Sequence, residues 1–105
     1  MKNALRFLSK DQSSKIKTGL YRHYKGKTYY VEGSAKHSET LEDMVIYQAM
    51  YKDPQFGDFA MWIRPLSMFL EAVNVDGYSV QRFTAMTDEE TALFERNLFL
   101  MMRAQ

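Results

Sequence analysis

Apolar and polar positions alternate between residues 19 and 83 in the manner of short β-strands. Four stretches rich in aromatic and β-branched residues are separated by Gly, Pro and polar residues, which predicts strands at Leu20–Tyr24, Thr28–Lys36, Met44–Tyr51 and Phe59–Arg64. Met44–Tyr51 also fits a helical stripe, but Val45, Ile46 and the flanking turn residues favour a strand. Because both of its faces are largely apolar, we expect that strand to be central and covered on both sides.

The alternation along Thr28–Lys36 assigns its side chains to two faces. One face carries Tyr29, Val31, Gly33 and Ala35, and the other carries Thr28, Tyr30, Glu32, Ser34 and Lys36. Gly33 in the middle of the strand predicts a bulge or a sharp bend.

The chain after the fourth strand predicts a helical turn and a hairpin. Pro65 has no N–H group and ends the strand, and Leu66–Glu71 can then form one turn that folds Met68 and Phe69 onto the core. Asp76-Gly77 supplies the positive φ angles of a type I′ turn, so Ala72–Val75 and Tyr78–Phe83 are expected to form the hairpin.

The two ends of the chain differ from this region. Residues 1–18 are polar and basic, with a short helix expected at Asn3–Lys10. Thr87-Asp88-Glu89-Glu90 is a capping box that starts a helix reaching about Arg103. Its apolar residues cover more than one side: Leu93, Phe94, Leu98, Phe99, Leu100, Met101 and Met102. Such a helix is either deeply packed or binds a partner, so homo-oligomerisation through it is one hypothesis.

These elements predict a mainly β fold. We expect a small SH3-like barrel of about five strands over residues 19–84, with residues 85–105 as an appended C-terminal α-helix of the same domain. The length of 105 residues suits one domain.

Charge is distributed unevenly. Residues 1–37 carry nine Lys or Arg and two acidic residues, a net +7, whereas residues 38–105 carry five bases and eleven acids, a net −6. This distribution indicates either a basic surface for an anionic partner or two parts that neutralise each other in the fold. There is no Cys, which excludes thiolate chemistry and disulfides. No targeting or membrane-spanning pattern is visible, so we expect a cytoplasmic protein.

Several motifs resemble the bacterial family known as domain of unknown function 1653. They are Gly19-Leu20-Tyr21-Arg22-His23-Tyr24-Lys25-Gly26, Ala35-Lys36-His37-Ser38-Glu39-Thr40, Val45-Ile46-Tyr47, Trp62-Ile63-Arg64-Pro65-Leu66-Ser67-Met68-Phe69, Val75-Asp76-Gly77 and Arg82-Phe83. The resemblance covers residues 19–84 and implies an SH3-type barrel in a small bacterial protein. It implies no activity. The loop Lys52–Asp58 is longer than is usual for the family, and both ends of the chain lie outside the match.

Trp62 and Arg64 form the first candidate site, because they share one face of the predicted fourth strand. With Tyr47 or Tyr30 nearby they can line an aromatic groove with a cationic end, suited to a peptide, a carboxylate or a stacked base. The alternative is that Trp62 fills the core and that Arg64 pairs with Glu39 or Glu71.

His37-Ser38-Glu39-Thr40 forms the second candidate site. A His, hydroxyls and a carboxylate invite a catalytic interpretation, but neighbours on one loop rarely face one another, and a turn bonded to its own backbone is the alternative. His23 and His37 match no metal-site spacing, and we expect no metal and no cofactor.

A basic, aromatic first hairpin is the third candidate, carrying Arg22, Lys25, Lys27 and Lys36 with Tyr21, Tyr24 and Tyr30. It offers weak support for binding nucleic acid.

The main hypothesis is a non-enzymatic binding module whose groove uses Tyr30, Tyr47, Trp62 and Arg64, with His37 and Glu39 at the rim. Its partner is an unknown protein, peptide or small anionic ligand. The alternative is an accessory enzyme on a small anionic or nucleotide-like substrate, with His37 as acid–base and Arg64 as anion clamp.

Overall fold

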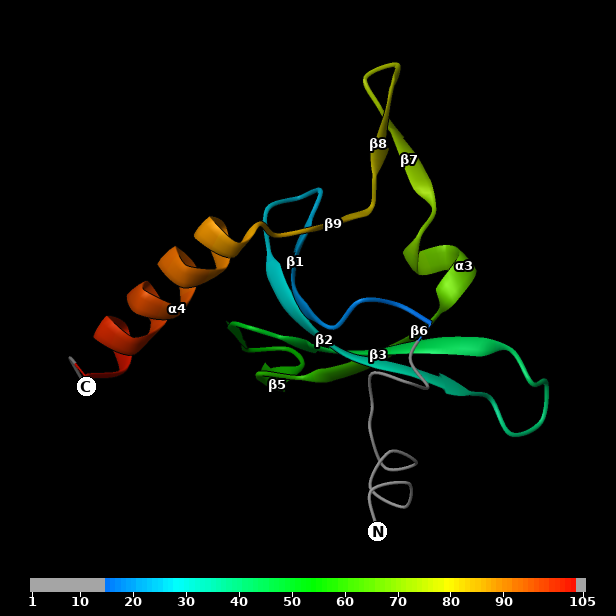
Figure 1. Cartoon of the computed structure of the whole chain (residues 1–105), viewed down its shortest axis with the longest axis horizontal. Coiled ribbons are helices and arrows are strands. Elements are labelled where there is room, and N and C mark those ends of the chain that lie inside the picture. Colours follow the sequence, from blue (N-terminus) through cyan, green and yellow to red (C-terminus); the bar gives the residue numbers. More distant parts are fainter. Residues whose placement is uncertain (1–14, 104–105) are drawn as a thin grey trace, which may run out of the picture.

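The structure, a computed structural model, describes residues 15–103 and is mainly β with one long C-terminal helix (Figure 1). The short helix expected at Asn3–Lys10 lies outside the described residues. The order of elements is β1 (Gly19–His23), β2 (Thr28–Lys36), β3 (Asp43–Ala49), β4 (Lys52–Asp53), β5 (Gly57–Asp58), β6 (Met61–Pro65), α3 (Leu66–Phe69), β7 (Ala72–Val75), β8 (Tyr78–Gln81), β9 (Phe83–Ala85) and α4 (Asp88–Arg103). The predicted strands, the helical turn and the terminal helix are therefore all present, with small shifts at their ends.

A five-stranded antiparallel sheet is the centre of the fold, with strand order β6-β3-β2-β1-β9. β1, β2, β3 and β6 follow one another, and β9 returns to pair with β1. The expected mainly β fold with a C-terminal helix is confirmed, but the sheet does not close into a barrel, because within the described residues β6 and β9 remain its two edges. The segment between them instead forms α3 and a separate two-stranded sheet, β7–β8.

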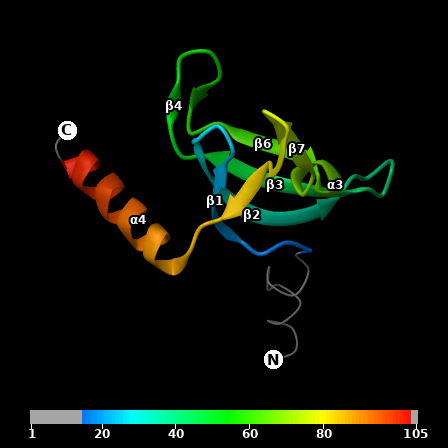
Figure 2. The same ribbon diagram turned by 90° about the horizontal axis from the view of Figure 1, so that it is seen from above.

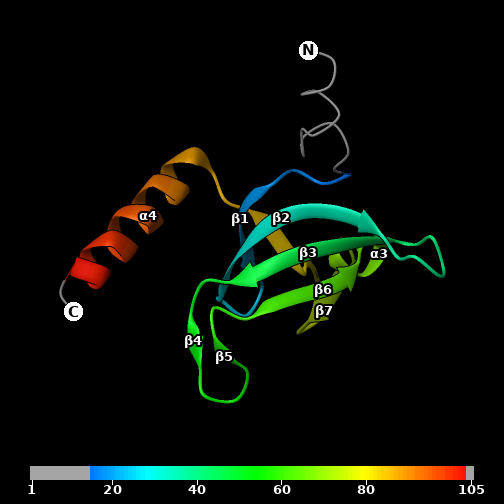
Figure 3. The ribbon, with the colours of Figure 1, turned by 90° about the horizontal axis from the view of Figure 1, so that it is seen from below.

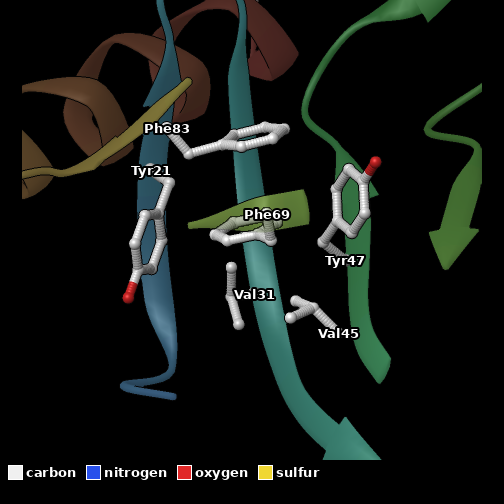
Figure 4. Close-up of a cluster of buried hydrophobic side chains, with 6 residues drawn as sticks. All are labelled: Tyr21, Val31, Val45, Tyr47, Phe69 and Phe83. Carbon is white, nitrogen blue, oxygen red and sulfur yellow. The ribbon is translucent and has the colours of Figure 1, made fainter. Parts of the chain in front are cut away.

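One face of the five-stranded sheet, which we call the inner face, carries the core. Its buried cluster consists of Tyr21, Val31, Val45, Tyr47, Phe69 and Phe83 (Figure 4). Phe69 comes from α3, is 1% exposed, and stacks on Phe83 with ring centroids 4.0 Å apart. Thus α3 covers the inner face with one ring. Met68, which was expected to pack there too, is 44% exposed.

The expected bulge is present in β2. Val31 pairs with Tyr47 and Gly33 pairs with Ile46, so Glu32 is one extra residue between the two pairs. The bulge reverses the alternation beyond it, because Ser34 then pairs with Val45 and Ala35 with Met44. The faces assigned from the sequence are therefore correct up to Val31 and wrong after it.

β3 is an interior strand, as expected, but it is covered less evenly than expected. Val45, Tyr47 and Ala49 on the inner side are buried. On the outer side Met44 is buried, but Ile46 and Gln48 are only half-buried.

α4 projects away from the sheet (Figures 2 and 3). The capping box at its start forms as expected: Thr87 Oγ1 accepts a bond from the Glu90 N–H (3.1 Å), and Glu90 Oε1 accepts one from the Thr87 N–H (3.0 Å). None of the residues of α4 is buried.

Candidate functional site

Trp62 and Arg64 lie on the inner face of β6, as their spacing predicts. Trp62 pairs with Tyr47, and Arg64 pairs with the buried Val45. The Nε–H of Arg64 donates to the Tyr47 hydroxyl at 3.2 Å, and the Arg64 guanidinium carbon lies 5.9 Å from the centre of the Phe83 ring. Arg64 therefore reaches along the inner face toward β9, and it does not pair with Glu39 or Glu71, the partners proposed as the alternative.

Trp62 packs against the core without being fully buried in it. Its ring is half-buried against the core cluster and meets Phe56 edge-on, with centroids 5.1 Å apart. Phe56 belongs to the long loop after β3, which folds into the small β4–β5 hairpin. One role of that loop is thus to shield one side of Trp62.

Tyr30 does not join this group. It pairs with Leu20 and Gln48, so its side chain points to the outer side of the sheet. There it lines a hollow of about 250 Å³ with Leu20, Met86 and Glu95. A second outer hollow, of about 440 Å³, lies between the β1–β2 turn and β8, and the Arg22–Glu90 ion pair lies in its wall.

Tyr47 and Tyr29 lie near Arg64 on the inner face instead, and Tyr51 is bonded to Tyr29. Tyr29 meets Tyr47, Tyr51 and Phe83 edge-on at 5.4, 5.5 and 5.7 Å. The hydroxyls of Tyr29 and Tyr51 are hydrogen-bonded at 2.5 Å. Burial, together with this bond, raises the pKa of Tyr29 well above its usual 10, so its hydroxyl stays protonated and able to donate.

His23 borders the same aromatic rings. Its imidazole is 5.0 Å from the Phe83 ring and 6.3 Å from the Tyr29 ring. Burial lowers the pKa of His23 below the usual 6.5, and the charges of Arg82, Lys25 and Arg64 lower it further. Nδ1 of His23 accepts the Lys25 N–H at 3.2 Å, which in the neutral ring places the proton on Nε2.

Arg82 completes the group and is the least satisfied of its members. It lies between β8 and β9, and its backbone bonds to Tyr24 and Glu71. Its Nε atom is buried and has no hydrogen-bond partner. An unsatisfied guanidinium N–H is unfavourable in a folded protein, and an oxyanion is the acceptor that arginine binds best.

We call this group the aromatic–cationic cluster: His23, Tyr29, Tyr47, Arg64, Arg82 and Phe83. The ion pairs among the described residues are Arg22–Glu90 and Lys36–Asp43, so neither arginine of the cluster is neutralised by a carboxylate there. Two guanidinium groups and an imidazole beside aromatic rings can bind a carboxylate or a phosphate.

His37 and Glu39 lie elsewhere, in the turn between β2 and β3. Nδ1 of His37 accepts the N–H groups of Glu39 (3.1 Å) and Thr40 (3.3 Å), and Thr40 Oγ1 accepts that of Glu42 (3.2 Å). These contacts belong to a turn bonded to its own backbone. Glu39 is exposed, and no contact joins either residue to Arg64 in the described region.

Each cation of the predicted basic hairpin has a local contact. Arg22 pairs with Glu90 at 2.7 Å and Lys36 with Asp43 at 2.9 Å. Lys25 and Lys27 lie over the rings of Tyr24 and Tyr51, at 5.8 and 4.8 Å. The hairpin is therefore not a row of unpaired cations, and this weakens the nucleic-acid hypothesis.

Sequence reasoning missed His23 and Arg82 as site residues. Both had been noted, His23 as one of only two histidines and Arg82 within the family motif Arg82-Phe83. Their proximity depends on β9 pairing with β1, which sets His23 opposite Phe83. The hairpin prediction had instead run Phe83 into the preceding strand.

Residues 15–103 contain neither a cluster of metal-ligating side chains nor a membrane-spanning helix. No group of three or more His, Asp or Glu side chains there is placed to hold a metal ion. No helix in the same range has the length and apolar character needed to cross a bilayer.

Fold and cluster together define a small, mainly β domain with an exposed C-terminal helix and an aromatic–cationic inner face. The chain belongs to the family described as protein of unknown function (DUF1653), whose model matches residues 19–85. It is also similar to a solved crystal structure of a DUF1653 protein from Bordetella bronchiseptica: the identity is 32%, the TM-score is 0.61, and the match covers 69% of this chain and 88% of that one. The curated proteins contain no match. The resemblance found in the sequence is thus confirmed.

Proposed function

We propose that this domain is a non-enzymatic binding module that holds an oxyanion, a carboxylate or a phosphate, in the aromatic–cationic cluster. The observation that carries the proposal is the pair Arg64 and Arg82, whose charges both act on His23 beside the aromatic rings and neither of which pairs with a carboxylate among the described residues. Arginine without a counter-ion next to aromatic rings is a common arrangement for recognising carboxylates and phosphates.

This site differs from the groove predicted from the sequence. Tyr47 and Arg64 remain, whereas Trp62 packs against the core and Phe56, and Tyr30 is on the other side of the sheet. We propose that His23 and Arg82 take the place assigned to His37 and Glu39. The enzyme alternative stays a hypothesis. The contacts of His37 within its own turn give it no support.

Titration of labelled protein followed by NMR tests the proposal. Acetate, inorganic phosphate and adenosine 5′-monophosphate serve as probes at constant ionic strength. They distinguish binding of a carboxylate, binding of a phosphate, and binding of a phosphate helped by a stacked ring. We expect saturable shifts at His23 and Tyr29, and roughly tenfold weaker binding in Arg82→Gln and in Arg64→Gln, because each loses a charge-assisted hydrogen bond.

Arg22→Gln is the matched control, because Arg22 already pairs with Glu90 on the outer side. Its binding should equal that of the unaltered protein. Shifts that never saturate with any probe, or equal weakening in all three variants, would show that the cluster binds no oxyanion.

A further inference from the structure

α4 exposes an apolar surface that the fold itself does not cover. Leu93, Phe99, Leu100, Met101 and Met102 are each more than half exposed. The three views agree that the helix projects from the sheet (Figures 1–3). A helix of 16 residues gains little stability by itself in water, so a face of this kind is usually covered by a partner.

Charge along the helix points to the identity of the partner. Glu89, Arg96 and Arg103 are spaced by seven residues and therefore follow one line along the helix. Ala92 and Phe99 flank this line on one side, and Leu93 and Leu100 flank it on the other. The guanidinium of Arg103 lies 5.9 Å from the Phe99 ring, which confirms that the two share this face.

An antiparallel copy of the same face is complementary to it. If two helices cross near Arg96, Glu89 of each lies level with Arg103 of the other. Leu93 then meets Leu100 of the copy on one side of this line, and the small Ala92 meets Phe99 on the other. The helix dipoles then oppose each other favourably. A parallel pair would place like charges together.

We propose that α4 is a dimerisation helix that pairs in antiparallel fashion with α4 of a second copy of this chain. The pairing buries Leu93, Phe99 and Leu100 and is fixed in direction by Glu89 and Arg103. The like charges of Arg96 face each other at the centre and moderate the affinity.

Light scattering coupled to size-exclusion chromatography of the full chain tests this. We expect a mass that rises with concentration toward twice the 12.4 kDa of one chain. Leu93→Glu combined with Leu100→Glu should weaken association by roughly tenfold or more, since both side chains leave the apolar seam. Leu70→Glu, equally exposed but outside α4, should leave the mass unchanged.

An exchange of charges between Glu89 and Arg103 distinguishes pairing with a second copy from binding of any other partner to α4. Glu89→Arg and Arg103→Glu should each weaken the dimer, and the two changes together should restore it, because only a copy of the same helix carries the compensating change. Arg96→Gln should tighten it. A chain that stays monomeric at high micromolar concentration overturns the proposal, and so does a dimer that the α4 variants leave unchanged. A monomer whose α4 NMR signals shift when residues 1–14 are removed overturns it in favour of that segment.

Discussion

Phe69 is the side chain that joins the helical turn to the inner face of the sheet. It stacks on Phe83 and meets Tyr21 and Tyr47 edge-on, each at 5.5 Å. Phe69→Ala removes a fully buried ring, and we expect it to lower the free energy of unfolding by about 3–5 kcal/mol. Urea denaturation measures this loss.

Leu70 provides the control for that substitution. It is the next residue in the chain but is 63% exposed. Leu70→Ala should change the free energy of unfolding by no more than about 0.5 kcal/mol. Equal losses in the two variants would mean that the ring of Phe69 is not the anchor of α3.

The protonation of His23 reports on the cluster. Burial and the nearby cations lower its folded-state pKa, so the unfolded chain takes up the proton first as the pH falls. The free energy of unfolding should therefore decrease as the pH drops through about 6.5. An NMR titration of the two histidine rings should show His23 titrating below its usual pKa.

Arg82→Gln tests the electrostatic part of that shift. Removing the guanidinium should raise the pKa of His23, and a bound oxyanion should raise it as well, because each change makes the local potential less positive. An unchanged pKa of His23 in this variant would show that the charge of Arg82 does not contribute to the shift. Arg96→Gln, in α4, serves as the control and should not move it.

The contacts of single residues were predicted well where they depend on neighbours in the sequence. They were predicted poorly where they depend on the pairing of strands that are distant in the sequence. Thr87 and Glu90 form the capping box, and Asp76 and Gly77 have the positive φ angles of 51° and 86° expected for their turn. His37 stands beside Ser38 and Glu39 in the sequence, yet its ring accepts the backbone N–H groups of Glu39 and Thr40. Nothing local to His23 indicates that Arg82 lies near it.

At the scale of elements, α4 is held mainly by its own first turn. Thr87→Ala removes the cap that accepts the Glu90 N–H, at a cost of about 0.5–2 kcal/mol. Because α4 has no buried residues, we expect reduced helical signal in circular dichroism with little change in the unfolding of the sheet. Thr91→Ala keeps the cap and should not reduce helicity; a similar loss in both variants would contradict a specific role for the cap.

The positions of the strands in the sequence were predicted more reliably than their pairing, their register and the faces of their side chains. Each stretch that alternates became a strand, since alternation directly reflects a half-buried sheet. The bulge at Glu32 was foreseen through Gly33, but one inserted residue exchanges the faces of everything beyond it. The β4–β5 hairpin was missed because its two-residue strands are too short to show a period.

For the whole molecule, the two oppositely charged parts of the chain meet in the fold. Both ion pairs of the described region, Arg22–Glu90 and Lys36–Asp43, join the basic first third to the acidic remainder. This supports mutual neutralisation over an unpaired basic surface. Closure of the sheet was not predictable in the same way, because it depends on where the segment between β6 and β9 places α3 and the β7–β8 hairpin.

The sheet should also fold without α4, in a shortened chain that ends at Met86. The core cluster, which includes Phe83, and the buried Met86 all remain, while residues 87–103, the described part of the segment removed, include none that is buried. The exposed Arg22–Glu90 pair is lost, and exposed pairs contribute little to stability. We expect the thermal midpoint and the near-ultraviolet circular dichroism of the sheet to stay close to those of the full chain, and the mass to be that of a monomer. A shortened chain that fails to fold would show that α4 supports the sheet in solution, and one that still dimerises would place the dimer contact outside the helix.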